Sequence, residues 1–528
     1  MMKSLWLTLI FAATTLVAQQ QQAVFDVIIE GGRVVDGTGS PWYVADIGIR
    51  GDRIEAVGSL RNAQAKQRID ARGLVVSPGF IDVHSHAARW LDENPMLESH
   101  VRQGVTSVIE GPDGGGPVPV SGPLNALAKQ RPTINYGWYS GHNAIRTKVI
   151  GLVNRKATAE ELEQMKALAR QDMLDGGFGL ATGLFYVPGN YAPTEEVIEI
   201  AKVVAPFGGM HISHMRDEAA KVLDAVKETI RIGEEGGLPT QVSHHKIIGK
   251  SNWGASTETL RLVAEARKRG VDVTIDQYPY TASSTGTAAM FPQWSLEGGA
   301  KSLRERLASP DGRAKIKAEI ERRIEEDRGA GDPKNVQFAR CEFDPALNGK
   351  TLADATKARG MAVTIPNAAE VAMDIQAKGG CSAIYHAISE KDVVQIMQAP
   401  WTMIASDGEA PVFGKAAPHP RGYGTFPRVL GRYVREQHVL TLEDAVRRMT
   451  GLPAARLKLT DRGLLRPGMK ADVVAFNADT IIDKSEFTNT HQYSVGMSTM
   501  VVNGEVVMVQ SKLTGARPGR ALYGPGKR

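Results

Sequence analysis

Residues 79–86 read Gly-Phe-Ile-Asp-Val-His-Ser-His, an apolar run that ends in His-x-His. Residues i and i+2 of a β-strand point the same way, so the imidazoles of His84 and His86 share one side. At the carboxyl end of a strand in a parallel barrel, that side is the catalytic mouth. Two convergent neutral imidazoles are good zinc ligands. Two surface histidines, or a capping pair, are the alternative interpretation.

Two further histidine clusters follow apolar runs of the same kind. His211 and His214 end one run, and His244 and His245 end another. His214 and His244 are thirty residues apart, which is about one strand–helix unit. Successive strands would therefore deliver imidazoles to the same rim. We expect His214 and His244 to bind metal, and we interpret His211 and His245 as structural residues behind them.

A late aspartate completes this pattern. Residues 403–408 read Met-Ile-Ala-Ser-Asp-Gly, so Asp407 is the polar residue at the end of another apolar run. A carboxylate here would bind metal and hold the proton of the attacking water. An Asp in a Ser-Asp-Gly turn is the alternative, since such turns are common. Together with the histidines, the position favours a functional role.

Strands and helices alternate through the middle of the chain. Amphipathic helices are predicted at residues 159–175, 219–235, 256–269 and 442–449, and apolar strands at 74–76, 107–110, 240–243 and 271–276. Repeated strand–helix units imply a parallel sheet in an α/β protein. About 380 residues in one such run favour a (β/α)₈ TIM-like barrel over an open doubly wound sheet.

The predicted barrel spans residues 78–465 and carries one interruption. Residues 283–348 begin rich in Ser, Thr and Gly and continue as a charged helix. We interpret them as an insertion or lid over the mouth of the barrel.

Both chain ends are predicted to be β-structure. Residues 24–77 contain short strands separated by Gly/Asp turns such as Gly31-Gly32, and residues 466–528 contain strand-like runs around an Asn503-Gly504 hairpin turn. We expect the two segments to pair into one small β-sandwich domain that brackets the barrel.

The first 18 residues have the pattern of a secretory signal peptide. Lys3 precedes an apolar stretch that is too short for a comfortable membrane span and ends at Ala18. Leu16 is bulky where a small residue is preferred, so an uncleaved anchor is the alternative. We expect a periplasmic or secreted protein with no other membrane segment.

Composition restricts the class of protein further. The net charge is +5 over 528 residues, and no Lys/Arg block tracks a phosphate backbone, which disfavours nucleic-acid binding. The two cysteines, Cys341 and Cys381, lie outside any CxxC or Cys/His cluster. In a secreted protein they either pair as a disulfide or remain buried thiols.

Here the sequence resembles a known family. The HxH after Pro-Gly-Phe-Ile-Asp, the downstream histidines and the late Asp resemble the amidohydrolase superfamily of metal-dependent (β/α)₈ hydrolases. Within it, the chain resembles the N-acyl-D-amino-acid deacylases (D-aminoacylases) in five stretches: residues 177–184, 214–218, 243–246, 276–281 and 419–428. The resemblance implies zinc-dependent hydrolysis of N-acyl-D-amino acids, small-molecule substrates, to a carboxylic acid and a D-amino acid.

The resemblance also implies roles for individual residues. His84 and His86 match the ligands of one metal position, His214 and His244 match those of a tighter one, and Asp407 matches the catalytic carboxylate. The resemblance also implies Arg421 on the substrate carboxylate and Tyr278 and Tyr280 as aromatic neighbours.

Two further substrate contacts are expected from the residues themselves. Arg216 is a rival for the carboxylate, and a structural ion pair with Asp217 or Glu218 is its alternative. Lys246 is expected to aid substrate or to orient a ligand, and a solvated surface lysine is its alternative.

One position departs from the family pattern. These deacylases often place a Cys ligand after the second strand, where this chain has Asp113 in a glycine-rich loop. A carboxylate also binds zinc, so the site is expected to survive with a harder ligand set. Glu110 is a weaker candidate, and a turn residue is the alternative interpretation of Asp113. One zinc ion and two bridged zinc ions both remain open.

Other functions fit the sequence less well. A cyclic-amide hydrolase of the same superfamily, such as a hydantoinase or dihydroorotase, uses a bridging carboxylated lysine at a strand end. Lys246 follows a histidine pair rather than standing alone, which counts against that reading. A nucleobase aminohydrolase has no need of a carboxylate-binding Arg. A non-catalytic binding protein would have lost metal ligands that this chain keeps.

Overall fold

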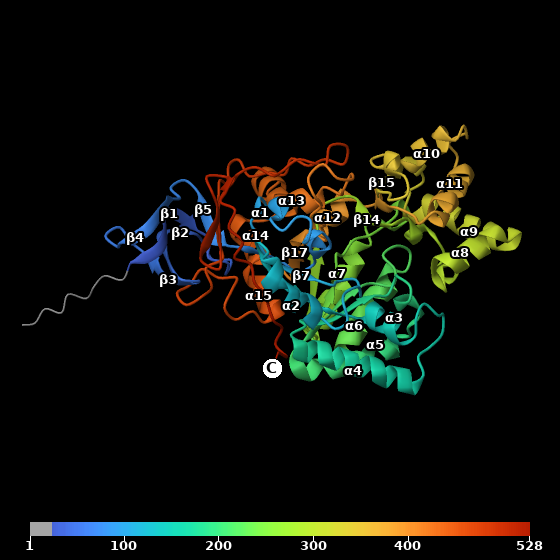
Figure 1. Cartoon of the computed structure of the whole chain (residues 1–528), viewed down its shortest axis with the longest axis horizontal. Coiled ribbons are helices and arrows are strands. Elements are labelled where there is room, and N and C mark those ends of the chain that lie inside the picture. Colours follow the sequence, from blue (N-terminus) through green and yellow to red (C-terminus); the bar gives the residue numbers. More distant parts are fainter. Residues whose placement is uncertain (1–23, 528) are drawn as a thin grey trace, which may run out of the picture.

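The computed structural model describes residues 24–527. The predicted signal peptide, residues 1–18, lies outside the described residues. Figure 1 shows three parts: a sheet at one end, a central body of strands and helices, and a group of helices, α8–α11, at the opposite end. Within residues 24–527, every helix is too short or too polar to span a lipid bilayer.

The first part is a nine-stranded sheet built from both ends of the chain (Figure 1). Strands β18 and β5 pair antiparallel and join the two halves. The first half contains β1 (Phe25–Val34), β2 (Tyr43–Arg50), β3 (Arg53–Gly58), β4 (Ala65–Asp70) and β5 (Val75–Pro78). The second half contains β18 (Val473–Phe476), β19 (Met497–Val502), β20 (Glu505–Val509) and β21 (Lys512–Leu513).

Local details of this sheet both confirm and correct the sequence predictions. Asn503 and Gly504 adopt φ angles of 48° and 82° between β19 and β20, as a two-residue hairpin requires. The predicted turn at Gly31-Gly32 is wrong, because β1 runs through it with a bulge. Residues 74–76 were expected in the strand–helix repeat, but β5 belongs to this sheet. All four residues of β5 are buried, so its sequence resembles the apolar run of a buried parallel strand. This resemblance explains why the sequence prediction placed it in the strand–helix repeat.

The central body holds two parallel sheets. One has the order β17-β13-β12-β11-β10-β9 and the other β6-β7-β8. Tyr139 alone separates β8 from β9, and a parallel bridge joins Ser85 to Gly408 just beyond β6 and β17. The strands are β6 (Phe80–Asp82), β7 (Val105–Glu110), β8 (Asn135–Trp138), β9 (Ser140–Gly141), β10 (Gly179–Gly183), β11 (Met210–His214), β12 (Thr240–Val242), β13 (Val273–Gln277) and β17 (Thr402–Ile404).

Amphipathic helices cover these sheets. Helix α4 shows why they form where they do: Thr158 and Glu161 make a reciprocal capping box at its start, and Gly176 ends it with φ 109°. The helices of the body are α1 (Glu98–Val101), α2 (Ser121–Gln130), α3 (His142–Val149), α4 (Ala159–Asp175), α5 (Thr194–Val204), α6 (Val222–Gly236), α7 (Ser256–Lys268), α12 (Glu390–Gln398), α13 (Arg421–Arg428), α14 (Leu442–Met449) and α15 (Gly451–Leu457).

A separate unit interrupts the body after β13. Its antiparallel sheet has the order β14-β16-β15, and it has its own apolar core and a Cys341–Cys381 disulfide. Its elements are β14 (Ser283–Gly286), α8 (Gly299–Ala308), α9 (Pro310–Arg322), β15 (Val336–Arg340), α10 (Leu352–Ala358), α11 (Ile365–Ala377) and β16 (Ser382–Tyr385). The unit runs past Asn348, the end expected from sequence, because β16 is the middle strand of its sheet.

Candidate metal centre

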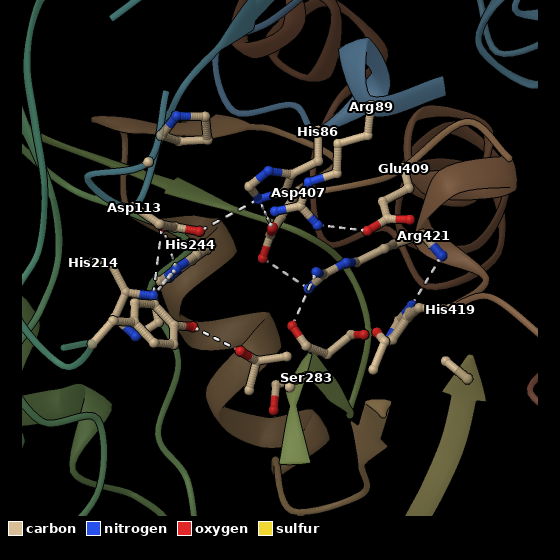
Figure 2. A pocket seen from close by; sticks show the side chains of 18 of the residues that line it. His86, Arg89, Asp113, His214, His244, Ser283, Asp407, Glu409, His419 and Arg421 are labelled. Atoms are coloured by element: carbon tan, nitrogen blue, oxygen red, sulfur yellow. Dashed lines mark hydrogen bonds and ion pairs between the residues drawn. The ribbon is translucent and has the colours of Figure 1, made fainter. Parts of the chain in front are cut away.

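Two groups of side chains that could hold a metal ion lie at the carboxyl ends of the parallel strands. Figure 2 labels His86, Asp113, His214, His244 and Asp407 among them. His84, His86, Asp113 and Asp407 form one group, in which the ligand atoms lie within 4.8 Å of one another. Asp113, His214 and His244 form the second under the same criterion. Asp113 belongs to both and stands between them.

The spacing of these atoms fits zinc. Asp113 Oδ2 lies 3.5 Å and 3.4 Å from Nε2 of His84 and His86, and Asp113 Oδ1 lies 3.2 Å from Nε2 of His244. Ligands held at roughly 2.0–2.1 Å in a tetrahedron around zinc are about 3.3 Å apart. His84 Nε2 and Asp113 Oδ1 are buried with no hydrogen-bond partner among the described residues, as expected for atoms that face a cation.

The ligands come from the ends of different strands. His84 and His86 follow β6, Asp113 follows β7, His214 ends β11, His244 follows β12 and Asp407 follows β17. Three of them have left-handed backbones, with φ 58° at Asp113, 33° at His244 and 49° at Asp407. Such conformations are costly for residues other than Gly and persist only where surrounding contacts enforce them.

Buried polar residues supply these contacts, and sequence reasoning missed them as positioning groups. The Asp276 carboxylate accepts a hydrogen bond from the His244 backbone N–H at 2.7 Å. The Ser243 hydroxyl lies 2.7 Å from His84 Nδ1, which leaves Nε2 of that ring toward Asp113. Asp82 accepts from the Ser406 backbone N–H at 3.0 Å. A carboxylate inside an otherwise apolar strand, as at Asp82 and Asp276, was the available signal.

A buried Lys–Glu pair supports the second group. Lys246 Nζ donates to Glu218 Oε1 at 2.5 Å and lies 2.8 Å from His244 Nδ1. Burial opposes ionisation of Glu218, but Lys246 and the nearby imidazoles outweigh it and hold the pKa of this carboxyl well below its usual range. Lys246 also donates to the His244 carbonyl at 2.8 Å, so it contacts both Glu218 and the backbone of His244.

The two carboxylates of the centre are ionised. Burial alone would raise the pKa of both, but the opposing charges prevail. His84 and His244 hold the pKa of Asp113 well below its usual range, and Arg421 with His84 does the same for Asp407. Both side chains are therefore acceptors at neutral pH and suit a divalent cation.

A pocket of about 620 Å³ opens onto both groups. Arg421 lines it, with Nη1 2.8 Å from Asp407 Oδ2 and the guanidinium 4.7 Å from the centre of the Tyr278 ring. The Arg421–Asp407 contact lacks hydrogen-bond alignment, so Nη1 remains available as a donor. The Tyr278 hydroxyl also has no hydrogen-bond partner among residues 24–527.

Two predicted substrate contacts lie elsewhere. Arg216 is engaged by Glu228 at 2.8 Å and by two backbone carbonyls, and it lines a neighbouring pocket instead. Its partner, Glu228 on α6, is twelve residues away in sequence, so the pair could not be predicted from the residues next to Arg216. Tyr280 is not among the residues that line the 620 Å³ pocket; Arg428 covers its ring at 4.7 Å. Both tyrosines follow the end of β13 at Gln277, so the rule that residues i and i+2 of a strand share one side does not apply to them.

The remaining candidates lie outside both groups. His211 is held between Thr182 and Thr240 at 3.0 Å and 2.8 Å, and His245 contacts Thr259 at 2.8 Å. Burial lowers the pKa of both imidazoles to about 3. These two histidines thus pack as neutral residues behind the ligands. Glu110 lines the pocket without joining either group.

The comparisons with known proteins agree with this geometry. The model of the amidohydrolase family matches residues 67–508. The chain is 35% identical to a D-aminoacylase of Alcaligenes xylosoxydans xylosoxydans over 96% of this chain and 99% of that protein. It is 37% identical to an N-acyl-D-glutamate deacylase of the same organism over 95% and 97%.

A solved structure is similar over nearly the whole chain. It is an N-acyl-D-glutamate deacylase of Bordetella bronchiseptica complexed with zinc and a phosphonate inhibitor that mimics the tetrahedral intermediate. It matches with a TM-score of 0.82 and 35% identity, over 95% of this chain and 100% of that one. From the site and these matches together, the chain belongs to the amidohydrolase family.

Proposed function

We propose that this protein hydrolyses the amide bond of N-acyl-D-amino acids with zinc as its cofactor, releasing a carboxylic acid and a D-amino acid. The observation that carries the proposal is the pair of ligand groups joined by Asp113 and facing Arg421 in one pocket. The D-aminoacylase and N-acyl-D-glutamate deacylase relatives support it over nearly their full length.

We also propose the architecture expected from sequence, a (β/α)₈ barrel with a β-sandwich made by the chain ends. The short break at Tyr139 and the Ser85–Gly408 bridge support closure of the parallel strands into one ring. Backbone hydrogen bonds from Asp407 N to His84 O and from His86 N to Gly408 O support it further, at 2.8 Å and 2.9 Å. A barrel places all five ligand-bearing strands at one mouth.

The residues of the site divide the reaction between them. Bound zinc polarises a carbonyl oxygen and makes water a better nucleophile at neutral pH. His84, His86 and Asp407 would hold one ion, His214 and His244 a second, with Asp113 shared. Asp407 accepts the proton of the attacking water and delivers it to the amide nitrogen. The carbonyl carbon thereby gains hydroxyl and the amine departs protonated.

Arg421 explains how one enantiomer is selected. Its free donors form a bidentate pair with the substrate α-carboxylate, and the Tyr278 ring packs against its guanidinium. With the carboxylate fixed at Arg421 and the amide fixed beside Asp407, the enantiomers differ only in where the α-hydrogen and the side chain point, so the pocket walls would make the selection.

The cyclic-amide alternative lacks support in the site. That chemistry calls for a carboxylated lysine between two metal ions, but Asp113 occupies the shared position. Lys246 is committed to Glu218 and His244. The linear amide therefore remains the preferred substrate.

Export to the periplasm or medium is proposed from the pattern of residues 1–18. The Cys341–Cys381 disulfide supports an oxidising compartment. Fractionation of cells that express the full chain tests it: the protein is expected outside the cytoplasm and shorter by the signal segment.

The deciding experiment is a hydrolysis assay with N-acetyl-D- and N-acetyl-L-amino acids, with zinc counted in the same sample. We expect turnover of D-substrates only. Asp407→Asn should lower kcat by about 10²- to 10⁴-fold in a folded protein, as for loss of a general acid–base group. Full activity of this variant would disprove the proton-transfer role. Full activity in a metal-free, folded sample would disprove the proposed function.

A further inference from the structure

One cation that lines the pocket has no carboxylate within ion-pair distance among residues 24–527; it also lines the neighbouring pocket, where Asp327 is the nearby acidic residue. Five cationic side chains line the pocket, and four of them have a carboxylate within 4 Å. These four pairs are Arg89 with Glu409, Lys246 with Glu218, Arg340 with Glu342, and Arg421 with Asp407. The fifth, Arg328, has neither a carboxylate partner nor a side-chain hydrogen bond among residues 24–527.

Arg328 is nevertheless buried, with 4% of its surface exposed. Its guanidinium lies 4.8 Å from the centre of the Phe185 ring and 5.6 Å from that of Tyr385. The ring faces offset part of the lost hydration of the cation. Its N–H donors have no acceptor among residues 24–527, and its nitrogens are absent from the fully covered unpaired atoms, so the donors are open to a ligand. An anion that enters the pocket would supply Arg328 with both a charged partner and hydrogen-bond acceptors.

Arg328 and Arg421 both lie beside strand β14. Both are connected to β14: Arg421 Nη2 donates to the Ser284 carbonyl at 3.4 Å, and the Tyr385 hydroxyl, beside Arg328, donates to the Gly286 carbonyl at 3.1 Å. These two carbonyls are two residues apart, about 7 Å along a strand. The two guanidiniums therefore flank one short wall of the pocket.

A second unpaired donor belongs to the same wall. Ser283, labelled in Figure 2, begins β14, is buried and lines the pocket, and its hydroxyl has no hydrogen-bond partner among the described residues. Unpaired buried donors in a ligand pocket are the groups that fix a polar ligand.

We propose that Arg328 binds a second carboxylate of the substrate, so that the preferred substrates are N-acyl-D-amino acids with two carboxylates. The inference rests on the proposed function, because it assigns the α-carboxylate to Arg421. A D-glutamyl or D-aspartyl side chain supplies the second carboxylate, and so does a dicarboxylic acyl group such as succinyl. Either forms the same bidentate pair with a guanidinium.

The test compares kcat/KM for N-acetyl-D-glutamate, N-succinyl-D-leucine and N-acetyl-D-leucine. The wild type should favour at least one dicarboxylate over N-acetyl-D-leucine. Arg328→Gln should lower that preference by about 10- to 100-fold, mainly through KM, with N-acetyl-D-leucine nearly unaffected. Arg328→Lys should restore part of it. Arg323→Gln is the matched control, because Arg323 lies over the same Phe185 ring but pairs with Glu319 and does not line this pocket, and it should leave the preference unchanged.

The outcomes distinguish a side-chain carboxylate from an acyl carboxylate, and they distinguish carboxylate binding from a purely structural role of Arg328. Loss confined to N-acetyl-D-glutamate assigns the side-chain carboxylate, and loss confined to N-succinyl-D-leucine assigns the acyl carboxylate. An equal loss on all three substrates would show that Arg328 only braces Phe185 against Tyr385, and would overturn the inference. So would a wild type that prefers N-acetyl-D-leucine, a result that needs no variant to fold. If the zinc-loaded wild type hydrolyses none of the three, the proposed function itself fails.

Discussion

Asp113 supplies one carboxylate oxygen to each ligand group, so its removal is the sharpest test of the metal centre. Asp113→Ala takes the first group from four ligands to three and the second from three to two. Three protein ligands suffice for a catalytic zinc site, but two do not. We therefore expect one ion per chain to be lost, that of His214 and His244.

The remaining ion should also bind more weakly. Replacing an outer partner of a metal ligand already costs 10- to 100-fold in affinity. Loss of a direct ligand should cost at least about 100-fold, which is about 2.8 kcal/mol. The carboxylate stands 3.4–3.5 Å from both imidazoles of the first group, so no other described side chain takes its place without moving.

The assay is a metal count by plasma mass spectrometry, with zinc affinity measured by competition with a chromophoric chelator. Glu110→Gln is the control: Glu110 ends the same strand, is buried in the same pocket and belongs to neither group, so its variant should keep both ions. Asp113→Cys should regain metal, since a thiolate binds zinc. If Asp113→Ala held as many ions as the wild type with equal affinity, Asp113 would be only a turn residue.

Three further outcomes follow from the contacts described. Arg421→Gln should raise KM by about 30-fold or more, with a smaller fall in kcat because Arg421 also touches Asp407; steady-state kinetics separates the two. Replacing Cys341 and Cys381 by Ser opens a 40-residue loop and should lower the free energy of unfolding by about 4 kcal/mol, and an unchanged Tm would contradict this. Burial lowers the pKa of His100 to about 4, so below pH 6.5 the unfolded chain binds more protons and stability should fall toward pH 4. Urea titrations at pH 7 and 4.5 should show that His100→Leu reduces this acid sensitivity.

The candidate metal ligands could be identified from sequence because each one stands at the carboxyl end of an apolar strand. A buried parallel strand reads as an apolar run, and the first polar residues after it mark its carboxyl end. His84, His86, His214, His244 and Asp407 all occupy such positions, and the structure brings all five together. The helices at residues 159–175 and 442–449 were predicted to the residue, because capping and amphipathic spacing are local signals.

Features that depend on contacts between distant parts of the chain could not be predicted from local sequence. Asp113 lies in a glycine-rich loop, where an aspartate reads equally as a turn residue, and its shared role depends on imidazoles more than 100 residues further along the chain. Glu218 and Lys246 meet across two strand–helix units. The insertion was predicted to end too early, because the pairing of β16 with β14 and β15 leaves no mark in local sequence.

The candidate metal site and the proposed selectivity residues belong to different parts of the fold. The candidate metal ligands lie at or just beyond the carboxyl ends of the parallel strands of the body, and Asp82 and Asp276, which hydrogen-bond behind them, lie within β6 and β13. Arg421, to which we assign the α-carboxylate common to all N-acyl amino acids, begins α13 of the same body. Arg328 and Ser283, which line the same pocket and which we assign to the variable part of the substrate, belong to the inserted unit with its own core and disulfide. Selectivity can therefore change in the insertion while the geometry of the metal centre, fixed by different contacts, stays intact.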